Sequence, residues 1–377
     1  RENLSGVRVI RAFNQQDNEQ KRFESTTTKQ KEGQIIAGNL SAVLNPATTI
    51  IVNFGIIAIL YISGFKINAG SMTQGEVISL INYMNQILLS MYVFANVIVI
   101  LNKASASYKR CADVLSQKQD IVQGINEAPS DYQNLITYDH VSFSYYSGNA
   151  LTDVSFNILP GQTIGVIGGT GSGKTTLINL IPRFYDVTEG EICIKDLPIK
   201  SYKFEDLRNM IGIVPQQATL FGGTIRENMQ WGNPHATDEE IYEALELSQS
   251  KEFIDKMTEG LDTYIEQGGK NVSGGQRQRL TIARALVKKP EILILDDSAS
   301  ALDFATDAKL RKALSTLNMT VIIVSQRVSA LMHADSIVVL SHGEVVGQGT
   351  HDMLMNTCDV YQEIVMSQME GGQSNEE

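Results

Sequence analysis

A glycine-rich stretch between two apolar segments offers the clearest chemistry in the sequence. It reads "TIGVIGGTGSGKTTLINLI" over residues 163–181 and satisfies the phosphate-binding pattern G-x-x-x-x-G-K-[ST]. Its glycines let backbone N–H groups turn inward around an anion, which a side chain would obstruct. Lys174 can reach the β- and γ-phosphates of a nucleotide, and Thr175 offers a hydroxyl to Mg²⁺. The residues predicted to hold the nucleotide are Gly168, Gly169, Thr170, Gly171, Ser172, Gly173, Lys174, Thr175 and Thr176.

A second apolar stretch, "ILILDD" over residues 292–297, ends in two carboxylates. Alone, this pattern is more typical of a buried strand that ends in a surface turn. Downstream of the glycine-rich loop, Asp296 suits a carboxylate that directs Mg²⁺ through a water molecule at the end of a strand. Together the two stretches predict a binding site for ATP and Mg²⁺.

Composition narrows the class of protein. The chain has 377 residues, enough for two or more domains, and its net charge of −11 disfavours broad contact with nucleic acid or an anionic lipid surface. Cys111, Cys193 and Cys358 are too few and too scattered for a disulfide framework or a metal site. The first residue is Arg1, so we expect the chain to begin inside a longer polypeptide.

Two long charge-free segments predict a pair of membrane-spanning helices. No charged residue lies between Glu32 and Lys66, or between Glu76 and Lys103. Each segment exceeds the roughly 20 apolar residues that cross a bilayer. We expect the spans at about residues 41–64 and 77–101. The alternative is a pair of buried helices in a soluble domain, but such helices rarely lack a charged face over this length.

Basic residues predict which ends of these helices face the cytoplasm. Residues 1–112 carry eleven Lys or Arg against six Asp or Glu, and of the eleven only Lys66 lies in the short connection between the spans. The positive-inside rule therefore places both outer ends in the cytoplasm and residues 63–76 outside. Such a chain would be a multi-pass protein of the cell membrane, with the lipid bilayer around its helices.

Downstream of the predicted spans, the pattern of apolar and polar residues changes twice. Residues 113–134 are polar without sustained periodicity and predict a linker. From Leu135 onward, short β-rich runs alternate with helical segments, which predicts an α/β domain over residues 135–370 and a flexible tail at 371–377. The expected fold class is therefore two-domain: an all-α transmembrane part over residues 1–112, followed by an α/β ATP-binding domain in the cytoplasm.

The segment "NVSGGQRQRLTIARAL", residues 271–286, resembles the signature motif of the ABC transporter superfamily. Ser273 is expected to cap a helix whose first glycines expose backbone N–H groups, and such a positive terminus attracts an anion. In the family, that anion is the γ-phosphate of an ATP held by the opposite subunit. The resemblance assigns this contact to Ser273, Gly274, Gly275 and Gln276.

Other motifs of the family follow in the expected order. Tyr145 matches the aromatic residue that stacks on adenine, although a lone tyrosine is more often part of a core. Gln216 matches the glutamine that touches Mg²⁺ and couples to the membrane domain, and Asp303 matches the aspartate that communicates across the dimer. The resemblance thus implies a P-loop ABC ATPase domain in which Thr175, Gln216 and Asp296 surround the metal, with Asp296 acting through water.

The N-terminal part resembles an exporter of the same family. "ENLSGVRVIRAFNQQ", residues 2–16, is similar to the cytoplasmic stretch after the fourth membrane helix of ABC exporters. The two predicted spans would then be the last two helices of a six-helix exporter domain, with the first four encoded upstream. The resemblance implies ATP-driven export of a substrate that the sequence does not identify.

Two residues depart from the family pattern. Asp297 stands where a catalytic glutamate is usual and Gln326 where a switch histidine is usual, whereas the signature is intact. With Gln216 they are the expected catalytic residues. The pattern resembles the degenerate half of a heterodimeric exporter, whose partner chain would carry Glu and His at the two positions. Two alternatives are a homodimeric exporter in which Asp297 is an adequate base, and a nucleotide-binding regulatory subunit that transports nothing.

The charge pattern predicts how cysteines are labelled in cells that express the protein. A membrane-impermeant thiol reagent added outside should react with the Asn68→Cys variant, because residues 63–76 are expected outside. Cys111, present in both the variant and the unmodified protein, should react only after the membrane is permeabilised. The reverse labelling pattern would overturn the orientation.

Overall fold

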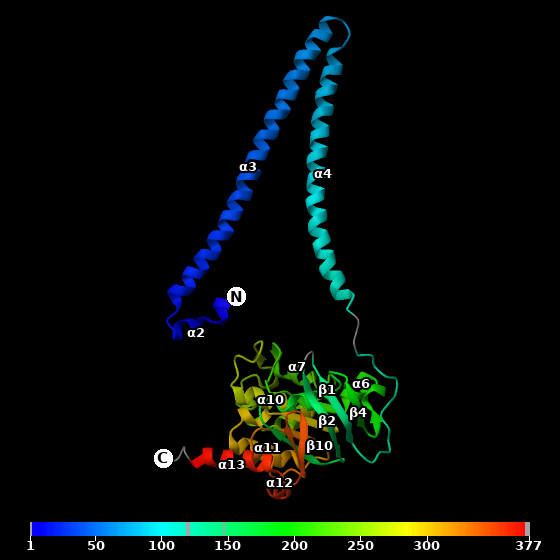
Figure 1. The fold of residues 1–377 in the computed structure, drawn as a ribbon, viewed down its shortest axis with the longest axis vertical. Coiled ribbons are helices and arrows are strands. Elements are labelled where there is room, and N and C mark those ends of the chain that lie inside the picture. Colours follow the sequence, from blue (N-terminus) through cyan, green and yellow to red (C-terminus); the bar gives the residue numbers. More distant parts are fainter. Residues whose placement is uncertain (1, 118–120, 146–147, 374–377) are drawn as a thin grey trace. The chain divides into compact units, whose positions relative to one another are not determined.

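The computed structural model describes residues 2–117, 121–145 and 148–373 and divides the chain into two compact units (Figure 1). Unit 1 is Arg1–Lys118 and unit 2 is Gln119–Glu377. Each unit is described by itself below.

Every described element of unit 1 is a helix. The helices are α1 (Glu2–Ser5), α2 (Val7–Ala12), α3 (Gln16–Asn68) and α4 (Gln74–Leu115). α3 ends where Gly70 adopts a left-handed φ of 71° and Ser71 N donates to the carbonyl of Lys66 at 3.0 Å, the pattern of a Schellman motif. α4 begins where Thr73 N donates to Glu76 Oε2 at 2.7 Å. These two helix ends make the short turn at which the chain reverses (Figure 1).

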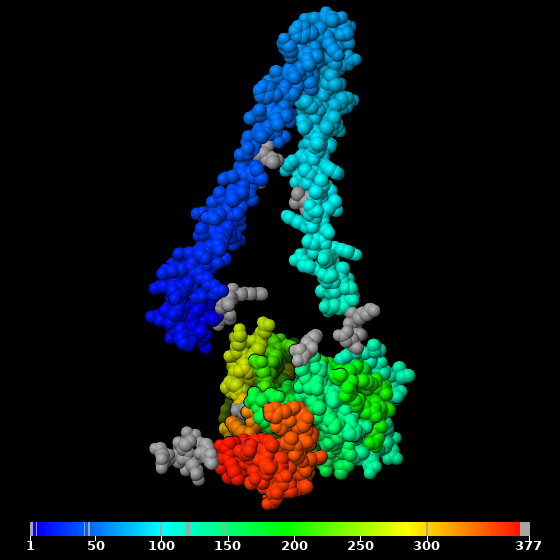
Figure 2. Space-filling model, viewed as in Figure 1, coloured from blue at the N-terminus to red at the C-terminus, as the bar shows by residue number. Residues whose placement is uncertain are grey.

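Apolar side chains remain exposed along α3 and α4. Figure 2 draws these two helices in space-filling form, coloured from blue to cyan. Two helical segments are long and apolar enough to cross a membrane, Pro46–Asn68 and Gln74–Leu115. The helices continue beyond the predicted spans, because a helix makes its backbone hydrogen bonds internally and can extend into polar flanks. Inside α3, Pro46 has no N–H to donate to the carbonyl four residues earlier.

Unit 2 contains two larger sheets and a two-stranded ribbon, β7-β8. The first sheet has the order β2-β1-β4-β5 and is antiparallel, and the second has the order β12-β11-β3-β10-β9-β6. In the second sheet the strands from β11 to β6 run parallel, and β12 pairs antiparallel with β11. The strands are β1 (Ile136–Ser144), β2 (Asn149–Ile158), β3 (Thr163–Gly168), β4 (Glu189–Ile194), β5 (Leu197–Pro198), β6 (Ile211–Val214), β7 (Gly223–Thr224), β8 (Tyr264–Ile265), β9 (Ile292–Asp296), β10 (Thr320–Val324), β11 (Ser336–Ser341) and β12 (Glu344–Gly349).

Helices connect these strands and end the chain. The predicted flexible tail, 371–377, overlaps the last helix, and residues 374–377 lie outside the described residues. The helices are α5 (Lys174–Leu180), η1 (Ile199–Ser201), α6 (Phe204–Asn209), α7 (Ile225–Gln230), α8 (Asp238–Leu247), α9 (Lys251–Ile254), η2 (Gly260–Asp262), α10 (Gly274–Val287), η3 (Ser298–Ala301), α11 (Phe304–Leu314), η4 (Val328–Ala330), α12 (His351–Thr357) and α13 (Asp359–Gln373).

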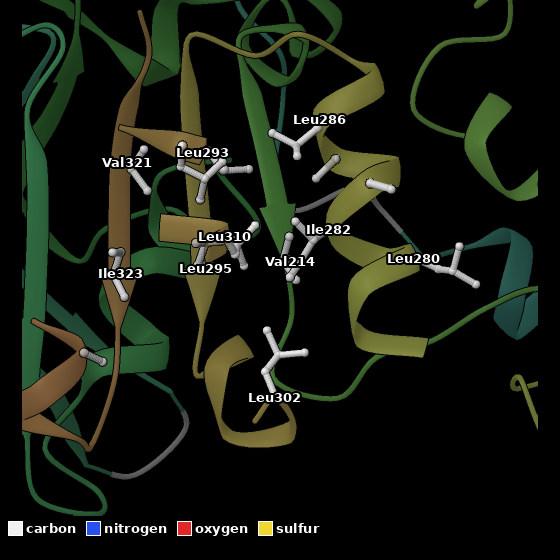
Figure 3. Close-up of a cluster of buried hydrophobic side chains, with 14 of the residues drawn as sticks. Val214, Leu280, Ile282, Leu286, Leu293, Leu295, Leu302, Leu310, Val321 and Ile323 are labelled. Carbon is white, nitrogen blue, oxygen red and sulfur yellow. The ribbon is translucent and has the colours of Figure 1, made fainter. Parts of the chain in front are cut away.

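The six-stranded sheet lies between two hydrophobic cores. Alternate residues of β9 belong to different cores: Leu293 and Leu295 to one, and Ile292 and Ile294 to the other. Because parallel strands are covered on both faces, they need a continuous apolar run such as "ILIL". Figure 3 shows part of the first core, where side chains of β9, β10 and α10 come together. Its members there include Val214, Ile282, Leu286, Val321 and Ile323.

The predicted linker, 113–134, differs from the structure at both ends. α4 continues through Leu115, and residues 121–134 belong to unit 2. Gly124 N donates to the carbonyl of Tyr202 at 2.8 Å, and a Cβ on Gly124 would lie 2.0 Å from the carbonyl oxygen of Ser201. Only glycine permits this approach. The polar, aperiodic sequence of this segment gave no sign of its attachment to the neighbouring backbone.

The core predicts the effect of shortening a central side chain. Leu293 is 0% exposed, so in a protein comprising unit 2 the change Leu293→Ala should lower the free energy of unfolding by about 2–5 kcal/mol. Urea denaturation measures the loss. Met366→Ala, at a side chain that is 56% exposed, is the control and should change it by less than about 0.5 kcal/mol. Equal effects of the two changes would contradict the packing described here.

Candidate functional site

The polar residues of the predicted site follow the ends of neighbouring parallel strands. β3 ends at Gly168, β9 ends at Asp296, and β10 ends immediately before Ser325. β10 lies between the other two strands, and its last residue pairs with Asp296. Since the carboxyl ends of parallel strands meet at one edge of the sheet, residues far apart in the sequence come together there, and ligands bind at such edges.

This edge borders a cavity of ≈ 290 Å³. Residues 170–176 of the glycine-rich loop line it, together with residues from several other segments. These others are Ala150, Gln216, Asp296, Asp297, Val324, Ser325 and Gln326. The structure thus brings the glycine-rich loop, the expected metal-binding residues and both departures from the family pattern into one cavity. Ala150 was missed from the sequence, where no local pattern marks it.

Two glycines of the loop are required by close backbone contacts. A Cβ on Gly168 would lie 2.2 Å from the carbonyl oxygen of Leu340. Gly173 has φ 102°, and a Cβ there would lie 2.7 Å from the carbonyl oxygen of Ala150. α5 begins directly after Gly173, and the positive end of such a helix at the cavity favours an anion.

Lys174 is buried in the wall of the cavity. Its Nζ donates to the carbonyl oxygens of Gly168 at 2.8 Å and Gly169 at 2.7 Å. Burial lowers the pKa of the Lys174 ammonium below its ordinary value, and the charges of Asp296 and Asp297 oppose this shift. An anionic ligand in the cavity would give this ammonium a charge-assisted partner that the two neutral carbonyls do not provide.

The carboxylates of the cavity offer ligands suited to Mg²⁺. Burial and the charge of Asp297 raise the pKa of Asp296, while Lys174 and a hydrogen bond from Thr175 oppose the rise. Gln216 Nε2 donates to Asp297 Oδ2 at 3.5 Å. Hard oxygen ligands of this kind fit Mg²⁺. Over the described parts of the chain, no group of three His, Cys, Asp or Glu could hold a metal alone, so phosphate oxygens and water would have to complete its coordination.

The backbone of Asp297 is left-handed, with φ 45°. Its N–H donates to the carbonyl of Val324 at 2.9 Å, which fixes the residue beside the end of β10. Aspartate tolerates left-handed backbone better than most residues other than glycine. This conformation was not visible in the sequence.

Tyr145 lies beside the glycine-rich loop, although it is not among the residues that line the cavity. Its hydroxyl is 3.4 Å from Thr176 Oγ1. The ring contacts Phe143 and Tyr185 edge-on, with centroids 4.8 and 5.3 Å apart. Since the side chain is 42% exposed, part of the ring surface is accessible, and stacking on adenine stays a prediction.

The predicted cap of the signature helix is confirmed. Ser273 Oγ accepts from Gln276 N at 3.2 Å, and Ser273 N donates to Gln276 Oε1 at 2.9 Å. This is a capping box at the start of α10, and the spacing S-x-x-Q is its sequence signal. The signature residues do not line the cavity, so their contact with another ATP stays a prediction.

Asp303 caps α11, a role that the family resemblance did not reveal. Its Oδ1 accepts from Thr306 N at 2.9 Å and its Oδ2 from Thr306 Oγ1 at 2.8 Å. These hydrogen bonds hold the pKa of Asp303 below its ordinary value. Asp303 therefore fixes the start of the helix that follows it, and its role across a dimer stays a prediction.

Comparison with known families agrees with this geometry. The family described as "ABC transporter" matches residues 151–300, and the one described as "ABC transporter transmembrane region" matches residues 1–91. The chain belongs to the ABC transporter family. The first match includes the glycine-rich loop, Gln216, the signature and both carboxylates, and it ends before Asp303 and Gln326.

Relatives of this ABC transporter chain extend over nearly all of it. An uncharacterized ABC transporter ATP-binding protein of Bacillus subtilis (strain 168) is 40% identical, over 99% of this chain and 66% of the relative. A probable multidrug resistance ABC transporter ATP-binding/permease protein of the same organism is 35% identical, over 96% of this chain and 63% of the relative. The chain therefore spans just under two thirds of the length of these relatives.

A solved structure confirms the fold class. A bacterial Atm1-family ABC exporter with ATP bound aligns with a TM-score of 0.86 and 27% identity, over 97% of this chain and 65% of that chain. With the family matches, this shows a helical transmembrane region followed by an α/β P-loop ABC ATPase domain.

The geometry of Lys174 predicts a binding defect. In a protein comprising residues 119–377, Lys174→Ala should weaken ATP affinity at least about tenfold, because the phosphates lose a charge-assisted contact. Titration calorimetry with MgATP measures it. Lys256→Ala is the matched control, since that side chain is 70% exposed and paired with Glu252. Unchanged affinity of a folded Lys174→Ala variant would rule out the assigned site.

Proposed function

We propose that this chain is part of an ABC exporter subunit that couples ATP binding and hydrolysis to export of a substrate across the cell membrane. Residues 1–112 would supply the last two helices of its membrane domain, with the ATPase domain in the cytoplasm. ATP and Mg²⁺ would occupy the ≈ 290 Å³ cavity. The proposal is supported by two helices of membrane-crossing length and a nucleotide-type site in one chain.

One observation carries a finer proposal, that this chain is the degenerate half of a heterodimer. Asp297 and Gln326 both line the cavity that contains Lys174, whereas the signature residues do not. Both departures would therefore weaken the ATP site of this chain, while Ser273 and Gln276 would complete the site of a second half-transporter. That partner chain would carry Glu and His at the two positions.

The side chains of Asp297 and Gln326 explain why ATP hydrolysis at this site would be slow. A carboxylate after Asp296 must orient the attacking water, and Asp297 is one methylene shorter than glutamate. If the carboxylate is misplaced by about 1 Å, the rate can fall on the order of 100-fold. This corresponds to an activation barrier that is higher by roughly 2.7 kcal/mol. Gln326 can form hydrogen bonds, but it cannot act as the acid–base partner that an imidazole provides.

The names of relatives favour a class of substrate. One relative is named a probable multidrug resistance ABC transporter, which supports export of drug-like compounds by this chain and its partner. Export by the intact membrane protein, measured with candidate compounds and ATP, distinguishes a transporter from a regulatory subunit that only binds nucleotide.

The assignment of the two ATP sites predicts opposite effects of two sets of changes in the assembled transporter. Asp297→Glu with Gln326→His should raise ATPase activity only modestly, since the backbone at position 297 is left-handed and suits aspartate. Ser273→Arg should nearly abolish activity by blocking the partner's site. Phosphate release measures both.

Asp297→Asn separates the remaining possibilities. In a degenerate half it should leave most of the turnover, because the partner's site carries it. If it abolished turnover together with Ser273→Arg, a homodimer would be supported. If it abolished turnover while Ser273→Arg had no effect, the two sites would be assigned the wrong way round.

A further inference from the structure

The loop that carries Gln326 is held by the side chain of a distant residue. Gln368 Nε2 donates to the carbonyl oxygen of Gln326 at 2.6 Å, and Gln368 Oε1 accepts from Val328 N at 3.0 Å. Between these two points, Arg327 N donates to Ser325 Oγ at 3.0 Å. Because a carbonyl only accepts and an N–H only donates, one orientation of the Gln368 amide satisfies both bonds. A single side chain thus fixes the loop at two points.

A second helix holds the next part of the same loop. Arg311 on α11 donates to the carbonyl of Ser329 at 3.0 Å, and it also pairs with Asp307 one turn earlier. Backbone polar groups in a loop lack the partners that a strand or helix supplies. Here side chains from α11 and α13 provide several of them.

α13 presents Gln368 from its packed face. Tyr361 is 0% exposed and Val365 is 3% exposed, and the spacing from Tyr361 through Val365 to Gln368 keeps all three on one side of the helix. The Tyr361 hydroxyl lies 2.8 Å from His351 Nδ1, which ties α13 to the start of α12 (red in Figure 1). Gln368 itself is exposed to solvent, at the end of this packed face.

We propose that Gln368 is a positioning residue for ATP hydrolysis in the cavity of this chain. It would act through the backbone of Gln326, a residue that lines that cavity. This inference rests on the proposed function, since it concerns the same ATP site. When the two hydrogen bonds are lost, the loop can move relative to the γ-phosphate. A displacement of about 1 Å at a reacting centre can lower the rate strongly.

The test must measure ATP hydrolysis at the site of this chain separately from hydrolysis at the partner's site. In the intact transporter, a photoreactive azido analogue of ATP, radiolabelled in either the α- or the γ-phosphate, is crosslinked to this chain after different times. The α-label reports binding, and loss of the γ-label reports hydrolysis at this site. The variants are Gln368→Ala and Gln368→Glu, with Met369→Ala as the control because that side chain is 67% exposed.

Gln368→Ala should slow loss of the γ-label about tenfold and leave the α-label within about twofold of the unmodified protein, since positioning affects the reaction more than binding. Gln368→Glu should be as slow at neutral pH, because a carboxylate accepts from Val328 N but cannot donate to Gln326. Relative to the unmodified protein at each pH, its rate should recover as the pH falls and the carboxyl is protonated. Met369→Ala should behave like the unmodified protein.

Two outcomes would overturn the proposal: an unchanged hydrolysis rate in Gln368→Ala, whether or not binding weakens, or a Gln368→Glu defect that is the same at every pH. The last would indicate a general effect on the fold. Lys174→Ala provides the separate test of the ATP site, since it should lose the α-label. If it retained that label, the proposed function would fail independently of Gln368.

Discussion

The common edge of four parallel strands is the constraint on which the site depends. Strands β3, β10, β9 and β6 are neighbours in one sheet that is covered on both faces, so polar side chains are placed where the strands end. Burial at that edge opposes the charges of both Lys174 and Asp296. The mutual attraction of these charges offsets part of that effect, and a bound cation with phosphates would relieve the rest.

The same fold separates two kinds of anion chemistry within one chain. The cavity combines a buried ammonium, two carboxylates and the start of α5. The start of α10 instead offers backbone N–H groups behind a serine cap and does not line that cavity. Since the residues that line the cavity do not include those at the start of α10, substitutions in the cavity need not disturb the signature residues. Under the proposed function, this separation would allow the ATP site of this chain to degenerate while the start of α10 kept its contacts to the partner's ATP.

Sequence reasoning succeeded where a motif dictates local geometry. The glycine-rich loop, the run into Asp296 and the S-x-x-Q cap each imply a backbone conformation, and the structure has them. It failed where contacts between residues distant in the sequence determine the local conformation. The left-handed backbone of Asp297, the hold of Gln368 on the loop and the close approach of Gly124 to Ser201 depend on partners remote in the sequence. Helix ends beyond the predicted spans were also missed, because hydropathy marks where lipid can lie and not where a helix stops.

Pro46 divides α3 into two mechanically different parts. The helix has 53 residues and, at about 1.5 Å per residue, is roughly 80 Å long, against about 30 Å for the hydrocarbon core of a bilayer. The helical residues before Pro46 form an arm of roughly 45 Å at about 1.5 Å per residue. Because a hydrogen bond is missing at the proline, the helix can bend at that junction. A bend of about 10° there would swing the far end of the arm through about 8 Å, so the position of one proline sets how far a small angular change is amplified.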